Sequence, residues 1–275
     1  MSGVGHVHVT RMGERMAYRI FGDGPRTLIC VHGLYRNGHD FDYLAEALAD
    51  RYRVVTPDMI GRGDSDYATD PSRYNVPEYV QDIRDLVAEL GLEAYDFLGT
   101  SMGGLVGMRL AAMPASGVRR LILNDVGPEV GLATLKEIGQ RSLRMPAQFD
   151  DYERVAAGLR VGLREWGELE EPQIRHLLRY SLAEQNGRWV LRYDRNLIAG
   201  FNWPAGDLDL WPVYRAFDGP VLVFRGARSQ VLTAATADKL KQEPNTRVVE
   251  IADAGHAPSL MVPAQIDIVR AFLDA

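Results

Sequence analysis

The fold is decided by one stretch, residues 95–104, which reads YDFLGTSMGG. It begins as a short apolar strand and runs into the helical pattern of residues 102–112. A Gly-x-Ser-x-Gly motif between a strand and a helix is typical of a nucleophile elbow, a sharp turn in which Ser101 takes a strained backbone. Such a turn lifts the serine oxygen above the sheet at a helix N-terminus, where amides and the helix dipole stabilise a developing anion. The motif therefore predicts that Ser101 is a nucleophile.

Short apolar runs alternate with helical patterns on both sides of this turn. The other predicted strands are 15–21, 27–31, 53–56, 121–124, 221–224 and 248–251, and the other predicted helices are 40–49, 77–90, 234–242 and 263–273. Near-continuous apolar strands joined by helical crossovers predict an α/β fold with a mostly parallel sheet covered on both faces. Only the first strands are expected to be antiparallel.

One segment, residues 127–212, breaks this alternation because it carries no strand pattern of that kind. Its helical windows are 132–144, 149–166 and 172–183. A long insertion between two strands of one sheet usually has a function. We expect an α/β core of residues 1–126 and 213–275, with residues 127–212 inserted as a helical cap.

Aromatic side chains of the expected cap are candidates for the wall of a substrate pocket. They are Phe149, Trp166, Tyr180, Trp189, Phe201, Trp203 and Trp211. Trp203, near the expected hinge, would give an apolar acyl pocket, whereas Trp211 is interpreted as packing of the cap on the core. The pattern predicts short to medium acyl chains in preference to long lipids.

The composition sets the range of partners. The chain has 275 residues, a net charge of -6 and 46% hydrophobic residues, which suffices for a full core. The acidic balance argues against nucleic acid or an anionic membrane as partner. The single cysteine, Cys30, lies in a predicted strand and excludes an internal disulfide. The sequence shows neither a basic start followed by an apolar stretch nor an apolar run of about 20 residues, so we expect a cytoplasmic protein. We expect it to be a monomer or a homodimer.

A general base for Ser101 must come from the histidines. Five of the six have other expected places: an N-terminal edge strand, the loop after the strand 27–31, or the cap; they are His6, His8, His32, His39 and His176. His256 follows the last predicted strand in the stretch AGHAP, where Gly255 lets the loop turn back over the sheet. The order serine, acid, histidine fits the elbow, so His256 is the predicted base.

Two backbone amides complete the predicted site. The strand 27–31 ends in His32-Gly33-Leu34, close to the elbow in this kind of sheet. We expect the N–H groups of Leu34 and Met102 to form the oxyanion hole, in which losing one donor typically costs about 10²–10³ in rate. No Cys, His, Asp or Glu cluster has metal-ligand spacing, so neither a metal nor a cofactor is expected.

Six motifs of the chain resemble the α/β-hydrolase superfamily with a helical cap. They are residues 32–41 (HGLYRNGHDF), 58–66 (DMIGRGDSD), 99–104 (GTSMGG), 121–129 (LILNDVGPE), 207–233 and 255–263 (GHAPSLMVP). The resemblance implies an eight-stranded α/β-hydrolase fold and a serine hydrolase of small carboxylic esters, similar to carboxylesterases and hydroxyalkanoate oligomer hydrolases. Haloperoxidases without cofactor and carbon–carbon bond hydrolases are similar folds. Dehalogenases and epoxide hydrolases differ, because they carry Asp where this chain has Ser101.

The acid of the triad is the point where the chain departs from the family. In the family the loop equivalent to residues 229–232 usually reads Ser-Asp, but here it reads Ser-Gln, with Gln230 at the position of the acid. An amide can accept the His256 N–H but cannot offset the imidazolium charge. Some members place the acid where Asp125 lies, and Asp253 is a weaker candidate. Three readings stay open: a relocated acid at Asp125, a slow enzyme with Gln230 alone, and a ligand-binding protein with an impaired triad.

Overall fold

The central sheet of the computed structural model, which describes residues 3–198 and 206–275, has eight strands. Their spatial order is β1 (Val4–Val9), β2 (Arg15–Phe21), β4 (Tyr52–Pro57), β3 (Arg26–Val31), β5 (Tyr95–Thr100), β6 (Val118–Asn124), β11 (Val221–Gly226) and β12 (Thr246–Ile251). Strand β2 pairs antiparallel with β1 and β4, and every other pairing of the sheet is parallel. The predicted fold class is confirmed.

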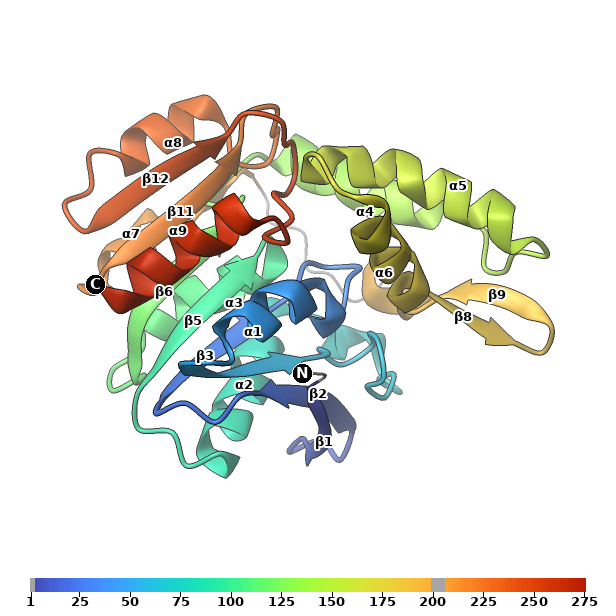
Figure 1. Ribbon diagram of the computed structural model, residues 1–275, viewed down its shortest axis with the longest axis horizontal. Coiled ribbons are helices and arrows are strands. Elements are labelled where there is room, and N and C mark those ends of the chain that lie inside the picture. The colour runs from blue at the N-terminus through green and yellow to red at the C-terminus, as the bar shows by residue number, and fades with distance from the viewer. Residues whose placement is uncertain (1–2, 199–205) are drawn as a thin grey trace.

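Helices cover both faces of this sheet (Figure 1). One face packs on α1 (Asp42–Leu48) and α9 (Pro263–Asp274), and the other on α2 (Val76–Glu89), α3 (Met102–Ala111) and α8 (Ala234–Leu240). Side chains of a strand point alternately to the two faces. In β3, Leu28 and Cys30 join the first core while Ile29 and Val31 join the second. This two-sided burial explains why the strands are apolar throughout, and it places Cys30 in the core, as expected.

Most of the chain between β6 and β11 lies to one side of the sheet, whereas its last helix, α7 (Trp211–Arg215), packs on α3 and the core (Figure 1). This segment contains α4 (Leu132–Leu143), α5 (Tyr152–Leu163), α6 (Glu171–Ser181), the strands β7 (Glu129–Val130), β8 (Leu182–Gln185), β9 (Arg188–Leu191) and β10 (Leu208–Asp209), and α7. Short 3₁₀ helices are Gly38–Phe41 (η1), Pro71–Arg73 (η2), Arg164–Trp166 (η3) and Arg195–Ile198 (η4).

A β-hairpin within this segment corrects the expectation that residues 127–212 carry no strand. Strands β8 and β9 pair antiparallel around Asn186 and Gly187, which both have positive φ angles of 52° and 75°. Asn-Gly is a strong signal for the two-residue turn that joins such strands. The predicted helix 172–183 runs over the first of these strands, whereas α6 ends at Ser181. The turn signal therefore outweighs the helical pattern there.

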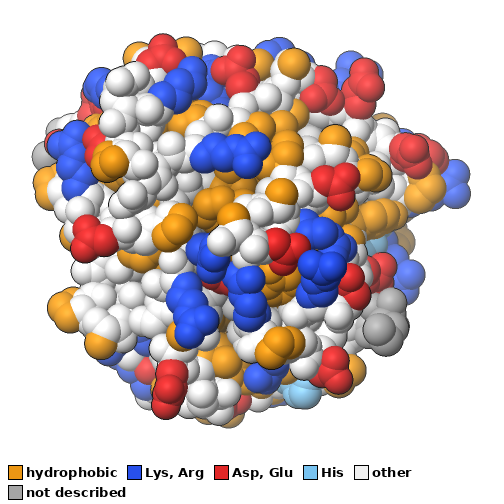
Figure 2. Space-filling model, turned by 60° about the vertical axis from the view of Figure 1, so that its left-hand side comes forward, with side chains coloured by type: hydrophobic (Ala, Val, Ile, Leu, Met, Phe, Trp, Pro, Cys, Tyr) orange, Lys and Arg blue, Asp and Glu red, His pale blue; other side chains and the backbone are white. Residues whose placement is uncertain are grey.

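The surface of the core carries charges of both signs. On the face drawn in Figure 2, several basic side chains gather near the middle, with acidic side chains among and around them; the whole chain has 31 Lys and Arg and 37 Asp and Glu. Among the described residues, no helix combines the length and apolarity needed to cross a bilayer.

Candidate active site

Ser101 occupies a strained turn between β5 and α3. Its φ of 53° and ψ of -112° lie outside the regions that residues with a side chain usually adopt. The turn needs glycine on both sides: a Cβ on Gly99 would lie 2.2 Å from the carbonyl oxygen of Gly103, and a Cβ on Gly103 would lie 2.1 Å from that of Val31. The amide of Ser101 donates to the Asn124 carbonyl at 3.0 Å and so ties the turn to β6.

The structure brings Ser101, His256 and Asp125 together from three separate loops. The Ser101 Oγ lies 2.9 Å from Nε2 of His256, and Nδ1 of the same ring lies 2.6 Å from Oδ2 of Asp125. Since a neutral imidazole carries one N–H, a ring that donates from Nδ1 to Asp125 presents the lone pair of Nε2 to the serine hydroxyl. This arrangement allows Nε2 to accept the serine proton.

Asp125 is fully buried and held by the neighbouring strand. Its Oδ1 accepts the amide N–H of Gly226 at 2.8 Å, and its Oδ2 accepts the hydroxyl of Ser229 at 2.5 Å. Its own φ is 55°, a left-handed conformation that Asp tolerates better than most residues. Hydrogen-bond donors of this kind offset the cost of burying a polar side chain. The role of Ser229 is not signalled by the sequence, because a serine in a polar loop has many possible partners.

The other two candidates for the acid lie elsewhere. Gln230 is exposed, and its amide nitrogen donates a long hydrogen bond of 3.5 Å to the carbonyl of Arg228. Asp253 is exposed as well, and its Oδ2 accepts the amide of Glu168 at 2.6 Å, so it links the His256 loop to the turn after η3. The carboxylate within hydrogen-bonding distance of Nδ1 of His256 belongs to Asp125.

Met102 follows Ser101 at the start of α3, Leu34 lines the same cavity as Ser101, and neither backbone amide has a hydrogen-bond partner among the described residues. A buried arginine supports this region. Arg62 donates to the Leu34 carbonyl at 2.9 Å, to the Tyr79 hydroxyl at 2.6 Å and lies 3.3 Å from the Met102 sulfur. Two free amides next to the serine are what an oxyanion hole requires. Arg62 was not among the predicted site residues, because the sequence does not show which groups its side chain contacts.

His32 belongs to the scaffold of the site. Its ring is buried, with Nδ1 2.7 Å from the Gly33 carbonyl and Nε2 accepting the Met59 amide at 3.0 Å. Burial, and then the nearby Arg62 charge, lower its pKa to about 3. His32 is therefore neutral at physiological pH and holds two loops together.

A cavity of ≈ 280 Å³ opens onto Ser101 and His256. The inserted segment contributes five apolar side chains to its wall, together with the polar Glu165 and Ser181; the apolar ones are Ile138, Leu159, Leu163, Trp166 and Leu178. Trp211 packs on the core, as expected, and Trp203 lies outside the described residues. The cavity is at the small end of the range for ligand sites, which favours a compact substrate.

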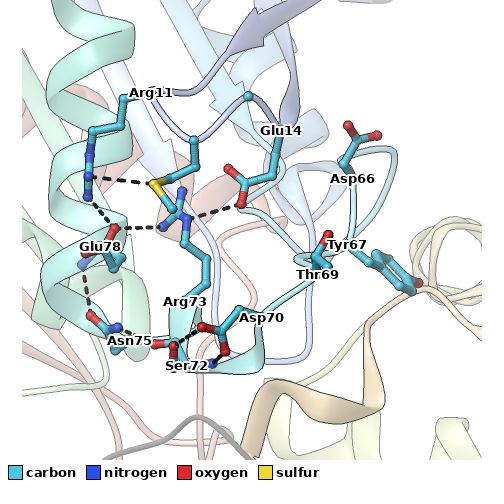
Figure 3. A pocket seen from close by; sticks show the side chains of 12 residues that line it. Arg11, Glu14, Asp66, Tyr67, Thr69, Asp70, Ser72, Arg73, Asn75 and Glu78 are labelled. Atoms are coloured by element: carbon cyan, nitrogen blue, oxygen red, sulfur yellow. Dashed lines mark hydrogen bonds and ion pairs between the residues drawn. The ribbon is translucent and has the colours of Figure 1, made fainter.

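A larger hollow of ≈ 670 Å³ lies away from these residues, around the turn after β1 and η2 (Figure 3). Its charged side chains pair with one another: Arg73 lies 3.4 Å from Glu14 and 3.5 Å from Glu78, and Arg11 pairs with Glu78. The residues that line this hollow include no histidine that could activate a nucleophile. We therefore place the candidate site at Ser101.

A second titratable cluster joins the core to the inserted segment, although the sequence spacing gave no sign of it. Ligand-type atoms of His39, Asp42 and His176 lie within 4.8 Å of one another. They already bond within the protein: Nδ1 of His39 is 2.6 Å from Asp42, and Nε2 of His176 is 3.0 Å from the His39 carbonyl. Arg19 lies 3.6 Å from Asp42, and its positive charge disfavours binding of a metal ion at this cluster. We interpret the cluster as a polar contact between the two parts of the chain.

A Ser–His–Asp arrangement above the carboxyl ends of a mostly parallel eight-stranded sheet defines a class of protein, the α/β hydrolases. The chain belongs to this family: the family model described as alpha/beta hydrolase fold matches residues 26–260. It is 42% identical over 272 residues to the 3-hydroxybutyrate-oligomer hydrolase of Cupriavidus necator, covering 94% of this chain and 92% of that protein.

Solved structures agree with this assignment. An alpha/beta hydrolase from Novosphingobium aromaticivorans superimposes with a TM-score of 0.90 at 33% identity, covering 99% of this chain and 98% of the other. The crystal structure of a Rickettsia typhi protein gives a TM-score of 0.91 at 30% identity, covering 100% and 99%. The family that the sequence motifs indicated is confirmed.

Proposed function

We propose that this chain is a serine hydrolase of small to medium carboxylic esters, with Ser101 as nucleophile, His256 as base and Asp125 as the acid that orients the ring. The observation that carries the proposal is the continuous hydrogen-bonded path from Ser101 through His256 to Asp125, at 2.9 and 2.6 Å, at the wall of an apolar cavity. Such a path is the signature of an activated serine.

The first half of the proposed reaction forms an acyl-enzyme. Nε2 of His256 accepts the hydroxyl proton while the Ser101 oxygen bonds to the ester carbonyl carbon. The carbonyl oxygen becomes an oxyanion that the amides of Leu34 and Met102 stabilise. The bond between that carbon and the alcohol oxygen then breaks, and His256 passes its proton to the leaving alcohol. Asp125 stabilises the imidazolium throughout.

The second half releases the acid. A water molecule takes the place of the alcohol, and His256 accepts its proton as the water oxygen bonds to the acyl carbon. The same two amides stabilise the second oxyanion. The bond to the serine oxygen breaks, and the proton returns from His256 to Ser101. The chain's own groups thus account for every proton of the cycle.

We propose further that residues 127–212 act as the cap that selects the substrate. Five apolar side chains of this segment line the cavity, whose small volume favours short acyl chains. Oligomers of 3-hydroxybutyrate are our first candidate, because they are the named substrate of the Cupriavidus necator relative and are short esters of small acids.

The experiment is an assay with p-nitrophenyl butyrate, p-nitrophenyl palmitate and the 3-hydroxybutyrate dimer. We expect turnover of the first and third, slower turnover of the palmitate, and loss of all turnover in Ser101→Ala. The matched control is Ser72→Ala, because Ser72 lies on the surface in η2 and contacts Asp70. Binding of the dimer without cleavage by the wild type would make the chain a ligand-binding protein and refute the proposal.

A further inference from the structure

The cavity at Ser101 contains one partly buried cation. Besides His256, the charged side chains of its wall are Arg36 and Glu165, as far as the described residues show. The Arg36 side chain is 19% exposed, whereas Glu165 is an exposed residue at the rim. Since water screens an exposed charge far more than a buried one, the Arg36 guanidinium, which pairs with the Asp40 carboxylate at 2.5 Å, is less screened than Glu165.

Arg36 reaches the cavity close to the nucleophile. A Cβ built on Gly33 would lie 3.8 Å from the Ser101 Cβ and 3.9 Å from the Arg36 Cγ, so Gly33 separates the two side chains. Arg36 and Ser101 line the same cavity, so one small substrate can contact both side chains.

The guanidinium is held rigidly by three neighbours. Its Nε and Nη2 donate to the Asp40 carboxylate at 2.5–3.1 Å, and its Nη1 donates to the Ser181 hydroxyl at 2.6 Å. The Trp166 ring lies over it, with 4.9 Å from the Arg36 Cζ to the ring centre. Ser181 and Trp166 belong to the inserted segment, so core and cap fix the same group.

These contacts leave donors for a ligand. A guanidinium has five N–H groups, and the bonds to Asp40 and Ser181 account for three of them. Asp40 offsets the net charge of the guanidinium, but the remaining N–H groups can still donate hydrogen bonds to a ligand. An arginine fixed in this way loses little entropy when it binds a planar anion, which is the arrangement that suits a carboxylate.

We propose that Arg36 binds a free carboxylate of the substrate, so that the enzyme prefers esters that carry a carboxylate close to the scissile bond over neutral esters of the same size. The inference rests on the proposed ester hydrolase activity and names its substrate class. The 3-hydroxybutyrate dimer fits, because it has a single ester bond and a carboxylate three bonds from the ester oxygen. Glu165 at the rim repels a carboxylate, so the acid end points toward Arg36.

The test compares the 3-hydroxybutyrate dimer as the free acid and as its terminal carboxamide, which is neutral, nearly equal in shape and also has one ester bond. We expect the wild type to favour the acid in kcat/KM by about 10-fold or more. Arg36→Gln lowers kcat/KM for the acid by about 10- to 100-fold, the range for a lost charge-assisted hydrogen bond, and lowers that for the amide less than about 3-fold. Arg36→Lys retains part of the preference for the acid, because it keeps the positive charge but not the planar pair of N–H donors.

Glu165→Gln is the matched control, because it removes the other charge at the cavity. Glu165→Gln should raise kcat/KM for the acid and leave kcat/KM for the amide near the wild-type value. Equal losses of both substrates in Arg36→Gln would mean a structural role and overturn the inference, as would a wild type without preference for the acid. Those outcomes leave the proposed function intact. Failure to cleave either dimer or p-nitrophenyl butyrate would instead overturn the proposed function itself.

Discussion

The carboxylate of Asp125 lies 2.6 Å from Nδ1 of His256, although Asp125 follows β6 and the family usually supplies the acid from the loop after β11. The two positions are neighbours in space because β6 and β11 are adjacent and parallel. The amide of Asp125 donates to the Phe224 carbonyl of β11 at 2.9 Å, which continues the ladder to the end of the sheet. A carboxylate can therefore reach the same imidazole from either strand.

Replacing Asp125 tests this geometry directly. Asp125→Asn keeps the shape of the side chain but removes the charge that stabilises the imidazolium, and it can donate to the ring and fix the wrong tautomer. We expect kcat for p-nitrophenyl butyrate to fall by roughly 10⁴, the loss known for the same change in a serine protease. KM should change little, since the buried carboxylate does not line the cavity.

The matched control for Asp125→Asn is Asp253→Asn, because both change a carboxylate near the His256 loop. Asp253 contacts the Glu168 amide and not the ring, so kcat should stay within about 10-fold of the wild type. Comparable losses in the two variants would contradict the assignment of Asp125 as the orienting acid.

Gln230 gives the reciprocal prediction. Its side chain is exposed and bonds to the Arg228 carbonyl, while Nδ1 of His256 already has a partner in Asp125. Gln230→Asp should therefore change kcat by less than about 3-fold, since a surface charge without a buried partner has little effect. An increase of 10-fold or more in the wild-type background would show that position 230 is the working acid site and that Asp125 is not.

Ser229 is expected to act as a positioning residue for Asp125. Its hydroxyl donates to Oδ2 of Asp125 at 2.5 Å, on the oxygen that also contacts His256. Ser229→Ala removes a hydrogen bond to a charged group and should lower kcat by about 10-fold, with Ser229→Thr recovering most of it. The split between kcat and KM distinguishes this role from a merely structural one: kcat should fall while KM stays near the wild-type value, and Ser229→Thr should restore kcat.

Much of the fold and part of the candidate site were predictable from local sequence signals. The elbow around Ser101 needs glycines at fixed positions, and the loop of His256 follows a strand, so both are visible in a single sequence. The choice between Asp125 and Gln230 was not predictable, because it depends on which side chain of two adjacent strand ends reaches the ring. A difference of a few ångströms decides which side chain contacts the His256 ring, and no sequence periodicity encodes the distance between a side chain and that ring.

The wall of the cavity was out of reach for a related reason. Arg36 lies in a core loop, and Ser181 and Trp166 come from a segment more than a hundred residues later in the chain. Their meeting depends on how the inserted segment packs on the core. The hairpin of β8 and β9, by contrast, was predictable from Asn186-Gly187, but the helical pattern that precedes it concealed the first strand.

Acid sensitivity is the last prediction, and it concerns His32. Burial and the Arg62 charge lower the pKa of His32 to about 3 in the folded chain, against about 6.5 when unfolded. Because the folded-state value is the lower one, the unfolded chain binds a proton that the folded chain rejects, and stability falls as pH drops below about 6.5. From pH 7 to pH 5 this single group should cost about 2 kcal/mol of the free energy of unfolding.

His32→Gln separates this contribution from the other histidines. Gln can still accept the Met59 amide, which Nε2 accepts in the wild type, but it does not titrate. We expect the variant to be less stable at pH 7, yet to lose about 2 kcal/mol less than the wild type between pH 7 and pH 5, as measured by urea unfolding at several pH values. His6→Gln serves as the control, because His6 is an exposed residue of β1. Parallel pH curves for His32→Gln and the wild type would show that His32 is not held neutral in the fold.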